Sequence, residues 1–241
     1  MYVKLFLLIL SIKACGQSGS QVKPDSSGEY TFSTTTADGT GKYFMGREIA
    51  QVMGPGGIDW LERPERLKEE NTGLVIKKLN LKASSIVADI GAGSGYYSFR
   101  IAPEVPEGKI YAVEVQQEMI DFLEKKKRET GTKNLKVIRG STININLPPG
   151  ELDIAIMVDV YHELISPKEI VQSIARSLKP DGKIILIEYR GEDPQIPIKA
   201  LHKTSIRQLT REFNKMGFTL FYSKDFLPMQ HFIVFQKTRT R

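Results

Sequence analysis

The sequence predicts an α/β fold in which helices cover both faces of a doubly wound, mostly parallel sheet. From residue 86 onward, apolar runs of five to seven residues alternate with helical patterns, as expected for such a three-layer fold. Runs such as "LDIAIMV" and "KIILIE" are almost continuously apolar, which suits strands buried on both faces. One run leads into glycines at alternate positions before a helical pattern, and such a turn lets backbone approach a ligand closely.

The composition is that of a globular protein able to build a core. The chain has 241 residues, 41% of them hydrophobic and 26% charged, which suits one large domain or one domain with additions. The net charge of +6 includes Lys4 and Lys13 from an opening segment without acids, so the remainder is only mildly basic. That balance is too weak to indicate nucleic-acid binding, and we expect a monomer without a nucleic-acid partner.

The opening residues, "MYVKLFLLILSIKACGQSGS", have the pattern of an export signal over residues 1–14. Lys4 precedes an apolar run that is far shorter than the roughly 20 residues of a membrane-spanning helix. Cys15, the only cysteine, follows where processing would occur. This segment resembles the lipobox of bacterial lipoproteins, which implies an exported protein, in the periplasm or cell envelope, held to the membrane through lipidated Cys15. Lys13 departs from that pattern, so a plain secretory signal, or a cytoplasmic protein that starts at Met45, stays open.

Two further segments precede the alternating region. Residues 15–42 are rich in Ser, Thr and Gly and predict a flexible tether. The main domain is expected to begin at residue 43, with N-terminal helices over residues 43–80. In "YFMGREIAQVM" the apolar residues have roughly helical spacing, and glycines at 54–57 would end that helix. A second helix is expected over residues 65–79.

The core is expected over residues 81–241. Its strands are predicted at residues 86–90, 109–115, 135–139, 152–158, 183–188, 219–223 and 232–236. Its helices are predicted at about residues 95–102, 116–129, 167–178 and 201–216. Ser166 and Glu169 form a capping-box pattern around Pro167, and Gly131 and Gly217 stand at C-cap positions. No long helix separates the last two strands, so a hairpin with an antiparallel last strand is expected.

The glycine turn in "SIVADIGAGSGYYSFRIA" limits the kind of ligand. Gly91, Gly93 and Gly95 alternate strictly, so the G-x-G-x-x-G pattern of NAD sites is absent, and so is the P-loop pattern. Asp89 lies two residues before the first glycine. Its carboxylate would repel a pyrophosphate but attract a cationic amine. The turn therefore disfavours an NAD-linked enzyme.

Five motifs in order resemble those of class I S-adenosylmethionine-dependent methyltransferases. They are "VADIGAGSGYYS", the acid at the end of "IYAVEV", "VIRGST", "ELDIAIMVDVYHEL" and "SLKPDGKIILIEY". The resemblance spans about residues 65–236. It implies a Rossmann-like, seven-stranded sheet with an antiparallel last strand, binding of S-adenosylmethionine and release of S-adenosylhomocysteine.

The resemblance also implies which residues bind the cofactor. Glu114 would take both ribose hydroxyls, whereas Ser141 stands where the family usually has an acid, so the adenine contact stays open. Asp159 would contact the methionine end of the cofactor or lie in solvent. The full expected set is Asp89, Gly91, Ala92, Gly93, Gly95, Glu114, Val115, Ser141, Thr142 and Asp159.

Methyl transfer needs alignment of an acceptor with an activated donor, and a base when the acceptor must lose a proton. His162 is the candidate base, with Glu163 to orient it or to bind a cationic acceptor, and Tyr161 to shape the acceptor pocket. The alternative is that His162 only closes its loop by hydrogen bonding. No metal is expected, because the sequence has no ligand motif such as His-x-x-x-His or paired cysteines.

The acceptor itself is not encoded in any motif. Trp60 would cover the cofactor or, as we favour, anchor a helix pair to the core. Arg63 and Arg66 would meet the cofactor carboxylate or, more simply, solvent, and His202 lies in an acceptor loop or on the surface. A small-molecule acceptor is favoured over a quinone-like lipid precursor or a protein side chain. Because S-adenosylmethionine is used inside cells, a non-catalytic, membrane-anchored binding or scaffold domain stays open.

Overall fold

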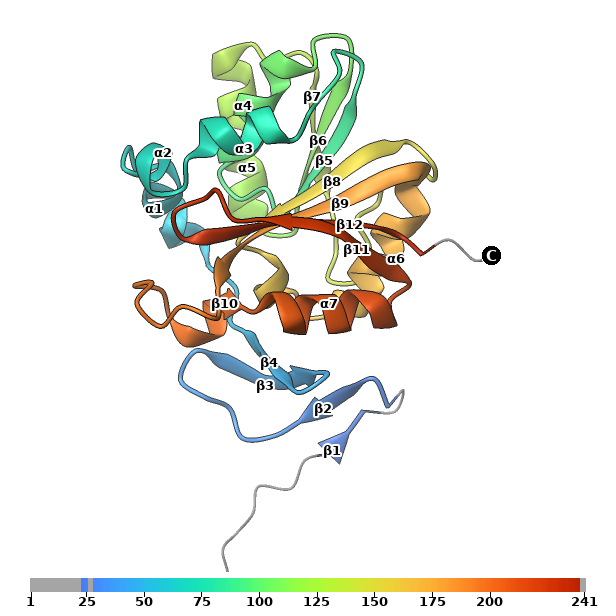
Figure 1. Ribbon diagram of the computed structural model, residues 1–241. Helices are drawn as coiled ribbons and strands as arrows, with labels where there is room; N and C mark the ends of the chain where they lie inside the picture. The colour runs from blue at the N-terminus through green and yellow to red at the C-terminus, as the bar shows by residue number, and fades with distance from the viewer. Residues whose placement is uncertain (1–22, 26–27, 239–241) are drawn as a thin grey trace, which may run out of the picture.

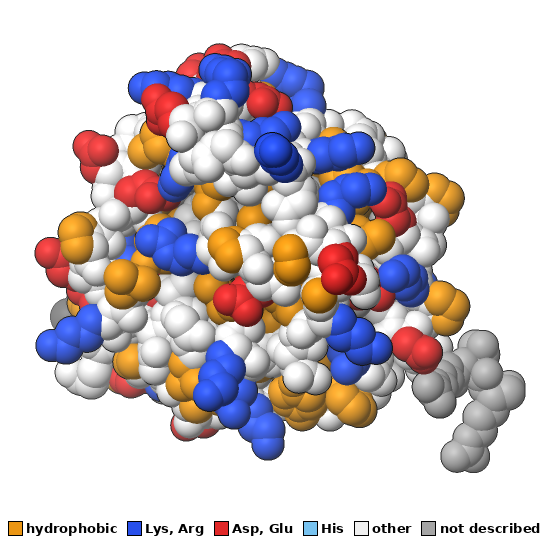
Figure 2. Space-filling model, turned by 90° about the horizontal axis from the view of Figure 1, so that it is seen from above, with side chains coloured by type: hydrophobic (Ala, Val, Ile, Leu, Met, Phe, Trp, Pro, Cys, Tyr) orange, Lys and Arg blue, Asp and Glu red, His pale blue; other side chains and the backbone are white. Residues whose placement is uncertain are grey.

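The computed structural model describes residues 23–25 and 28–238. The expected export signal, Cys15 and the first part of the expected tether lie outside these residues. Within the described ranges, no helix combines the length and apolar character needed to cross a bilayer. On the face seen in Figure 2, Lys and Arg side chains are interspersed with Asp and Glu rather than gathered into one basic patch.

The centre of the molecule is a sheet whose main path has the strand order β11-β12-β9-β8-β5-β6-β7 (Figure 1). The strands are β5 (Ile86–Ile90), β6 (Lys109–Glu114), β7 (Leu135–Arg139), β8 (Leu152–Val158), β9 (Leu178–Arg190), β11 (Phe218–Lys224) and β12 (Gln230–Lys237). Strand β12 runs antiparallel to both of its neighbours, whereas β5 to β9 pair in parallel. This confirms the predicted fold class. The two-residue β10 (Lys203–Thr204) pairs in parallel with the end of β9.

Helices cover both faces of the sheet. Those that follow β5 are α4 (Tyr96–Ile101), α5 (Gln117–Thr130), α6 (Pro167–Ser177) and α7 (Ile206–Lys215). Neighbouring residues of β8 alternate between two buried clusters: Ile154 and Ile156 pack with residues of α4 and α5, and Ala155 and Met157 pack with residues of α6 and α7. The continuous apolar runs therefore arise because each strand serves two cores.

The helix ends follow only part of the predicted chemistry. Gly131 caps α5 at a φ of 63°, as predicted. Ser166 is the residue before α6, but its side chain makes no capping bond. The predicted capping box is wrong because the Glu169 carboxylate instead accepts the Tyr30 hydroxyl at 2.5 Å. A contact from a distant part of the chain has replaced the local one.

The segment before the core is a separate antiparallel sheet and corrects two predictions. It comprises β1 (Lys23–Pro24), β2 (Tyr30–Phe32), β3 (Gly39–Phe44) and β4 (Arg47–Ala50). Residues 23–42 are therefore not a plain tether, and residues 43–50 are not helical. Met45 and Gly46 form the two-residue turn between β3 and β4, with φ values of 49° and 85°, which is the backbone that hairpin turns require. Tyr30, Phe44 and Ile49 form a small buried cluster of this sheet.

Short helices connect this sheet to the core. They are the 3₁₀ turn η1 (Pro55–Gly57), α1 (Ile58–Glu62), α2 (Arg66–Glu69) and α3 (Thr72–Lys78). The single helix predicted over residues 65–79 is divided at Asn71, whose φ is 50°. The division matters for the site, because it lets α1 and α2 lie over the glycine turn while α3 packs against the core.

Candidate functional site

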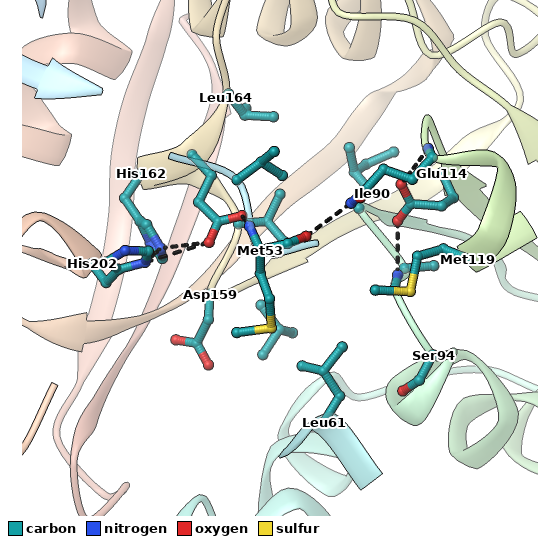
Figure 3. A pocket seen from close by; sticks show the side chains of 18 of the residues that line it. Met53, Leu61, Ile90, Ser94, Glu114, Met119, Asp159, His162, Leu164 and His202 are labelled. Atoms are coloured by element: carbon teal, nitrogen blue, oxygen red, sulfur yellow. Dashed lines mark hydrogen bonds and ion pairs between the residues drawn. The ribbon is translucent and has the colours of Figure 1, made fainter. Parts of the chain in front are cut away.

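A cavity of about 650 Å³ opens where the parallel strands β5, β6, β8 and β9 end. Ligands of open α/β sheets bind at this edge, and the volume lies within the roughly 300–1,000 Å³ of small-molecule sites. Figure 3 shows Glu114 and Met119 on one side of the cavity and His162 and His202 on the other, with Asp159 between them. One space thus joins the predicted cofactor residues to the predicted catalytic residues.

The glycine turn supplies one wall of the cavity. Gly91 and Gly93 line it with φ values of 69° and 53°, in the left-handed region that favours glycine. A Cβ on Gly91 would lie 2.7 Å from Val160 Cγ1. Gly95 was also expected to bind the cofactor, but it does not line the cavity. It precedes α4, and a Cβ there would meet Leu123 and Phe99.

Glu114 is held in place by backbone amides. Its Oε1 accepts the N–H groups of Val115 and Gln116 at 2.6 and 3.0 Å, and its Oε2 accepts Gly93 N–H at 3.0 Å (Figure 3). The carboxylate therefore links the end of β6 to the glycine turn. It is largely buried and lines the cavity, so its remaining lone pairs can accept hydroxyl groups of a ligand.

Two buried carboxyl groups at the strand ends face the same space. Asp89 Oδ2 accepts the Ser98 hydroxyl at 2.6 Å, and burial raises the pKa of Asp89 to about 6. Asp159 Oδ2 accepts the Gln230 amide at 2.7 Å, but its Oδ1 is buried without a hydrogen-bond partner. Burial raises the pKa of Asp159 well above its ordinary value. Because orphaned buried oxygens are costly, Asp159 Oδ1 marks a position for a ligand donor.

The opposite end of the cavity has predicted and unpredicted members. His162 is 1% exposed, and its Nδ1 lies 2.6 Å from Glu188 Oε2. Burial lowers the pKa of His162, but the carboxylates of Glu188 and Glu163 outweigh it and raise this pKa to about 10. Such an imidazole is protonated at neutral pH, so this arrangement argues against His162 as a general base. Glu163 lines the cavity as expected, with its pKa lowered to about 2 chiefly by the two histidines, against the opposing effect of burial.

Tyr161 does not take its expected place in the acceptor pocket. Its side chain is fully buried in the core beneath the cavity, where its hydroxyl donates to Glu212 and its ring lies against Phe213. In the 3₁₀ turn over residues 161–163, Tyr161 points inward while its neighbours His162 and Glu163 line the cavity. The prediction that Tyr161 shapes the acceptor pocket is wrong.

The helices α1 and α2 supply a polar wall that sequence reasoning largely missed. Arg66 was assigned to solvent but is 4% exposed, and its Nε donates to Glu70 Oε2 at 2.8 Å. The Tyr189 hydroxyl donates to Glu70 Oε1 at 3.2 Å. Trp60 is 48% exposed, with its ring 3.6 Å from the Arg63 guanidinium. Trp60 lines the cavity rather than anchoring a helix pair, so the favoured interpretation was wrong.

The rim near Glu114 contains the other predicted residues. Ala92, Val115, Ser141 and Thr142 all line the cavity. The Ser141 hydroxyl accepts Asn144 N–H at 3.0 Å and closes a turn. Ser141 therefore shapes the rim through the turn that it closes. Where the family usually has a carboxylate, this chain has the Ser141 hydroxyl.

Residues 81–231 match the family described as "Methyltransferase domain". The chain belongs to this methyltransferase family. It is 30% identical over 139 residues to a Bacillus subtilis (strain 168) protein named "Uncharacterized methyltransferase YcgJ", covering 57% of this chain and 54% of that one. It is 28% identical over 142 residues to a Lactobacillus johnsonii demethylmenaquinone methyltransferase, covering 58% and 57%. This chain spans about half the length of these curated relatives.

Solved methyltransferase structures share the architecture. A SAM-dependent methyltransferase from Aquifex aeolicus superposes with a TM-score of 0.72 at 25% identity, over 76% of this chain and 98% of that one. A neocarzinostatin-pathway O-methyltransferase, solved with S-adenosylmethionine and a naphthoic acid, superposes at 0.61 and 17% identity, over 71% of this chain and 54% of that one. The fold is thus that of S-adenosylmethionine-binding methyltransferases.

The residues of the cavity suit S-adenosylmethionine. That molecule carries a ribose diol, a cationic amino group and a cationic sulfonium. The Glu114 carboxylate offers acceptors for the diol, and the orphaned Asp159 oxygen offers an acceptor for a cationic amine. Because Gly91 and Gly93 have no side chains, a ligand can lie directly against the backbone of the glycine turn. The donor set therefore fits the ligand that the family resemblance implied.

Affinity for S-adenosylhomocysteine should fall as the pH is lowered through about 6, because the buried Asp89 carboxyl loses its charge there. The ligand's amino group stays protonated throughout, since its ordinary pKa is about 8. Calorimetric titrations at about pH 7.5 and about pH 5 should therefore differ. Asp89→Asn should remove most of that difference, and equal wild-type affinities at the two pH values would contradict the assignment.

Proposed function

We propose that this protein is an S-adenosylmethionine-dependent methyltransferase that acts on a small-molecule acceptor. The observation that carries the proposal is the shared cavity, which is lined by Glu114 and the glycine turn and also by His162 and Glu163. A donor and an acceptor held in one cavity can be aligned for an in-line displacement. When bound, S-adenosylmethionine supplies an activated methyl group on a positively charged sulfur.

The chain's own residues then bind and orient. Glu114 accepts the ribose hydroxyls, and its three backbone donors keep the carboxylate from turning away. Asp159 Oδ1 accepts a proton of the ligand's amino group, which relieves an orphaned buried oxygen. Asp89 adds negative charge beside the same end of the ligand. These contacts fix the donor and leave the region near His162 for the acceptor.

The acceptor region favours a compact, partly apolar molecule. Its walls are mostly apolar side chains: Val52, Met53, Leu164, Ile165, Pro197 and Ile198. Burial of apolar surface by such walls provides affinity without fixing the chemistry of the methylated atom. Several curated relatives are named demethylmenaquinone methyltransferases, so phenols and quinols are the first class of acceptor to test, followed by thiols.

Titration calorimetry with S-adenosylhomocysteine should detect one site per chain, and methyl-labelled S-adenosylmethionine should transfer label to at least one acceptor of this class. Absence of binding at about millimolar ligand, which corresponds to less than about 4 kcal/mol of binding free energy, would refute the cofactor assignment. Binding without transfer to phenols, quinols or thiols would favour the alternative of a ligand-binding domain without turnover.

A further inference from the structure

Three side chains with metal-ligand chemistry meet at the acceptor end of the cavity. His162 and Glu163 belong to the 3₁₀ turn η3 (Tyr161–Glu163), and His202 ends the 3₁₀ turn η4 (Ala200–His202). The structure brings His162 Nε2, Glu163 Oε1 and His202 Nδ1 within 4.8 Å of one another. Figure 3 shows the two imidazoles side by side, with dashed lines running to a carboxylate oxygen. No sequence motif indicates this cluster, because 39 positions separate Glu163 from His202.

The separations fit the ligands of one small divalent ion. His162 Nε2 lies 3.1 Å from His202 Nδ1 and 3.6 Å from Glu163 Oε1, and the last pair is 3.4 Å apart. Ligands about 2.0–2.1 Å from a tetrahedral zinc ion lie roughly 3.3 Å from one another. An entering ion would replace the proton held between His162 Nε2 and His202 Nδ1, while the contacts of Glu188 with His162 Nδ1 and of Met53 N–H with Glu163 Oε2 would stay.

Surrounding bonds orient two of the three ligand atoms, those of His162 and Glu163, toward the cluster. Glu188 Oε2, which is fully buried, contacts His162 Nδ1 at 2.6 Å and thereby directs Nε2 to the cluster. Such a carboxylate behind a histidine is a recurrent support of metal-bound imidazoles. Met53 N–H donates to Glu163 Oε2 at 3.0 Å and leaves Oε1 facing the histidines. The Glu188 carboxylate is itself fixed by the N–H groups of Val160 and Tyr161.

A cation balances the charges of the cluster. Glu163 and Glu188 place two largely buried carboxylates beside the histidines, and uncompensated buried charges are strongly destabilising. A proton shared through His162 provides one positive charge, whereas a divalent ion provides two. Two histidines and one carboxylate form the set of three protein ligands that open, catalytic metal sites use.

We propose that His162 Nε2, Glu163 Oε1 and His202 Nδ1 bind one divalent transition-metal ion, zinc in the first instance, within the acceptor end of the cavity. Three protein ligands leave a coordination position that faces the cavity. Resting on the proposed function, this position would take the acceptor's hydroxyl or thiol, whose proton leaves to water. The acceptor's lone pair then forms the bond to the methyl carbon as the carbon–sulfur bond of the sulfonium breaks.

The test measures metal content and affinity on the full chain, purified without a histidine tag and stripped with a chelator. After loading with Zn²⁺ and gel filtration, the wild type should retain about one ion per chain. Loading with Co²⁺ should give a visible absorption band of a low-symmetry nitrogen and oxygen site. His202→Ala should weaken Zn²⁺ binding at least about 10- to 100-fold, and Glu163→Gln should do the same while keeping the size of the side chain.

His231→Ala is the matched control. His231 is the third histidine of the chain, pairs with Glu192 at 2.8 Å and does not line the cavity. It should retain metal as the wild type does. Binding of S-adenosylhomocysteine to each variant shows that it is folded and tests the proposed cofactor separately. A wild type that binds S-adenosylhomocysteine but retains no Zn²⁺ or Co²⁺ would overturn the metal site and leave a proton-bridged cluster. Equal retention by His202→Ala would overturn it as well.

Discussion

Replacing Glu114 with alanine should weaken binding of S-adenosylhomocysteine by roughly 100-fold or more. Hydrogen bonds to a charged group each contribute about 1.5–3 kcal/mol, and the ribose would lose two of them. The substitution also releases the N–H groups of Gly93, Val115 and Gln116, which now converge on the carboxylate. Titration calorimetry of both proteins measures the change, in which each factor of ten corresponds to about 1.4 kcal/mol.

Two variants separate the role of the ribose from that of the loop. Glu114→Gln keeps one acceptor oxygen and should fall between the wild type and Glu114→Ala. Glu118→Ala removes an exposed acid one turn away on α5 and should leave affinity unchanged. If Glu114→Ala bound the ligand as tightly as the wild type, the carboxylate would have no part in the site.

The central sheet could be predicted almost residue by residue because its signals are local. β5, β7 and β8 have the predicted bounds, since each is an apolar run that ends in a turn residue or a charge. β9 is longer than the predicted strand at residues 183–188: it begins at Leu178 and includes the "KPDG" stretch. Leu178 pairs with Leu152 of β8, and pairing resumes at Lys183 after a shift in register, which no sequence pattern reports.

The N-terminal hairpin shows how apolar spacing can mislead. Phe44 and Ile49 are five residues apart, which was interpreted as helical spacing, but both are buried members of one small sheet cluster. The informative signal was Gly46, which with Met45 makes a two-residue turn between short strands. A hairpin this small is not stable alone, so its formation depends on contacts with the core that the sequence does not reveal.

The residues of the site also differ in how far the sequence predicts them, according to whether a local pattern or a distant segment places them. Asp89, the glycines and Glu114 were predictable because strand ends place them at one edge of the sheet. The places of Arg66, Glu70 and His202 in the site were not, since each depends on how a separate segment folds over that edge. The i,i+4 spacing of Arg66 and Glu70 was a visible cue for their ion pair, but it does not indicate that the pair is buried against a cavity.

A buried ion pair joins the N-terminal sheet to Glu212 of α7, which is fully buried. Arg47 of β4 donates to it through Nε at 2.9 Å and Nη2 at 3.0 Å, a paired geometry that favours arginine. The Tyr161 hydroxyl donates to Glu212 Oε2 at 2.6 Å. Arg47 also donates to the carbonyl oxygen of His162 at 3.2 Å, so this ion pair supports the turn that bears the proposed metal ligands.

Replacing Glu212 with alanine should lower the free energy of unfolding by about 3–5 kcal/mol, because it leaves the Arg47 guanidinium and the Tyr161 hydroxyl in the core without their acceptor. Chemical denaturation followed by tryptophan fluorescence or circular dichroism measures the change. The loss should exceed that of a typical core substitution, since the ion pair holds two layers together as well as burying charge.

Glu129→Ala is the matched control for Glu212→Ala. Glu129 also pairs with a cation, Lys125, at 3.8 Å on α5, but both side chains are more than half exposed. Exposed pairs of this kind contribute about 0.3–0.5 kcal/mol, so the two variants should differ several-fold in their cost. If Glu212→Ala unfolded at the same denaturant concentration as Glu129→Ala, the N-terminal sheet would not depend on the buried pair for its attachment to the core. β4 leads directly into the wall of the cavity. Glu212→Ala should therefore also weaken ligand binding under conditions in which this variant is folded.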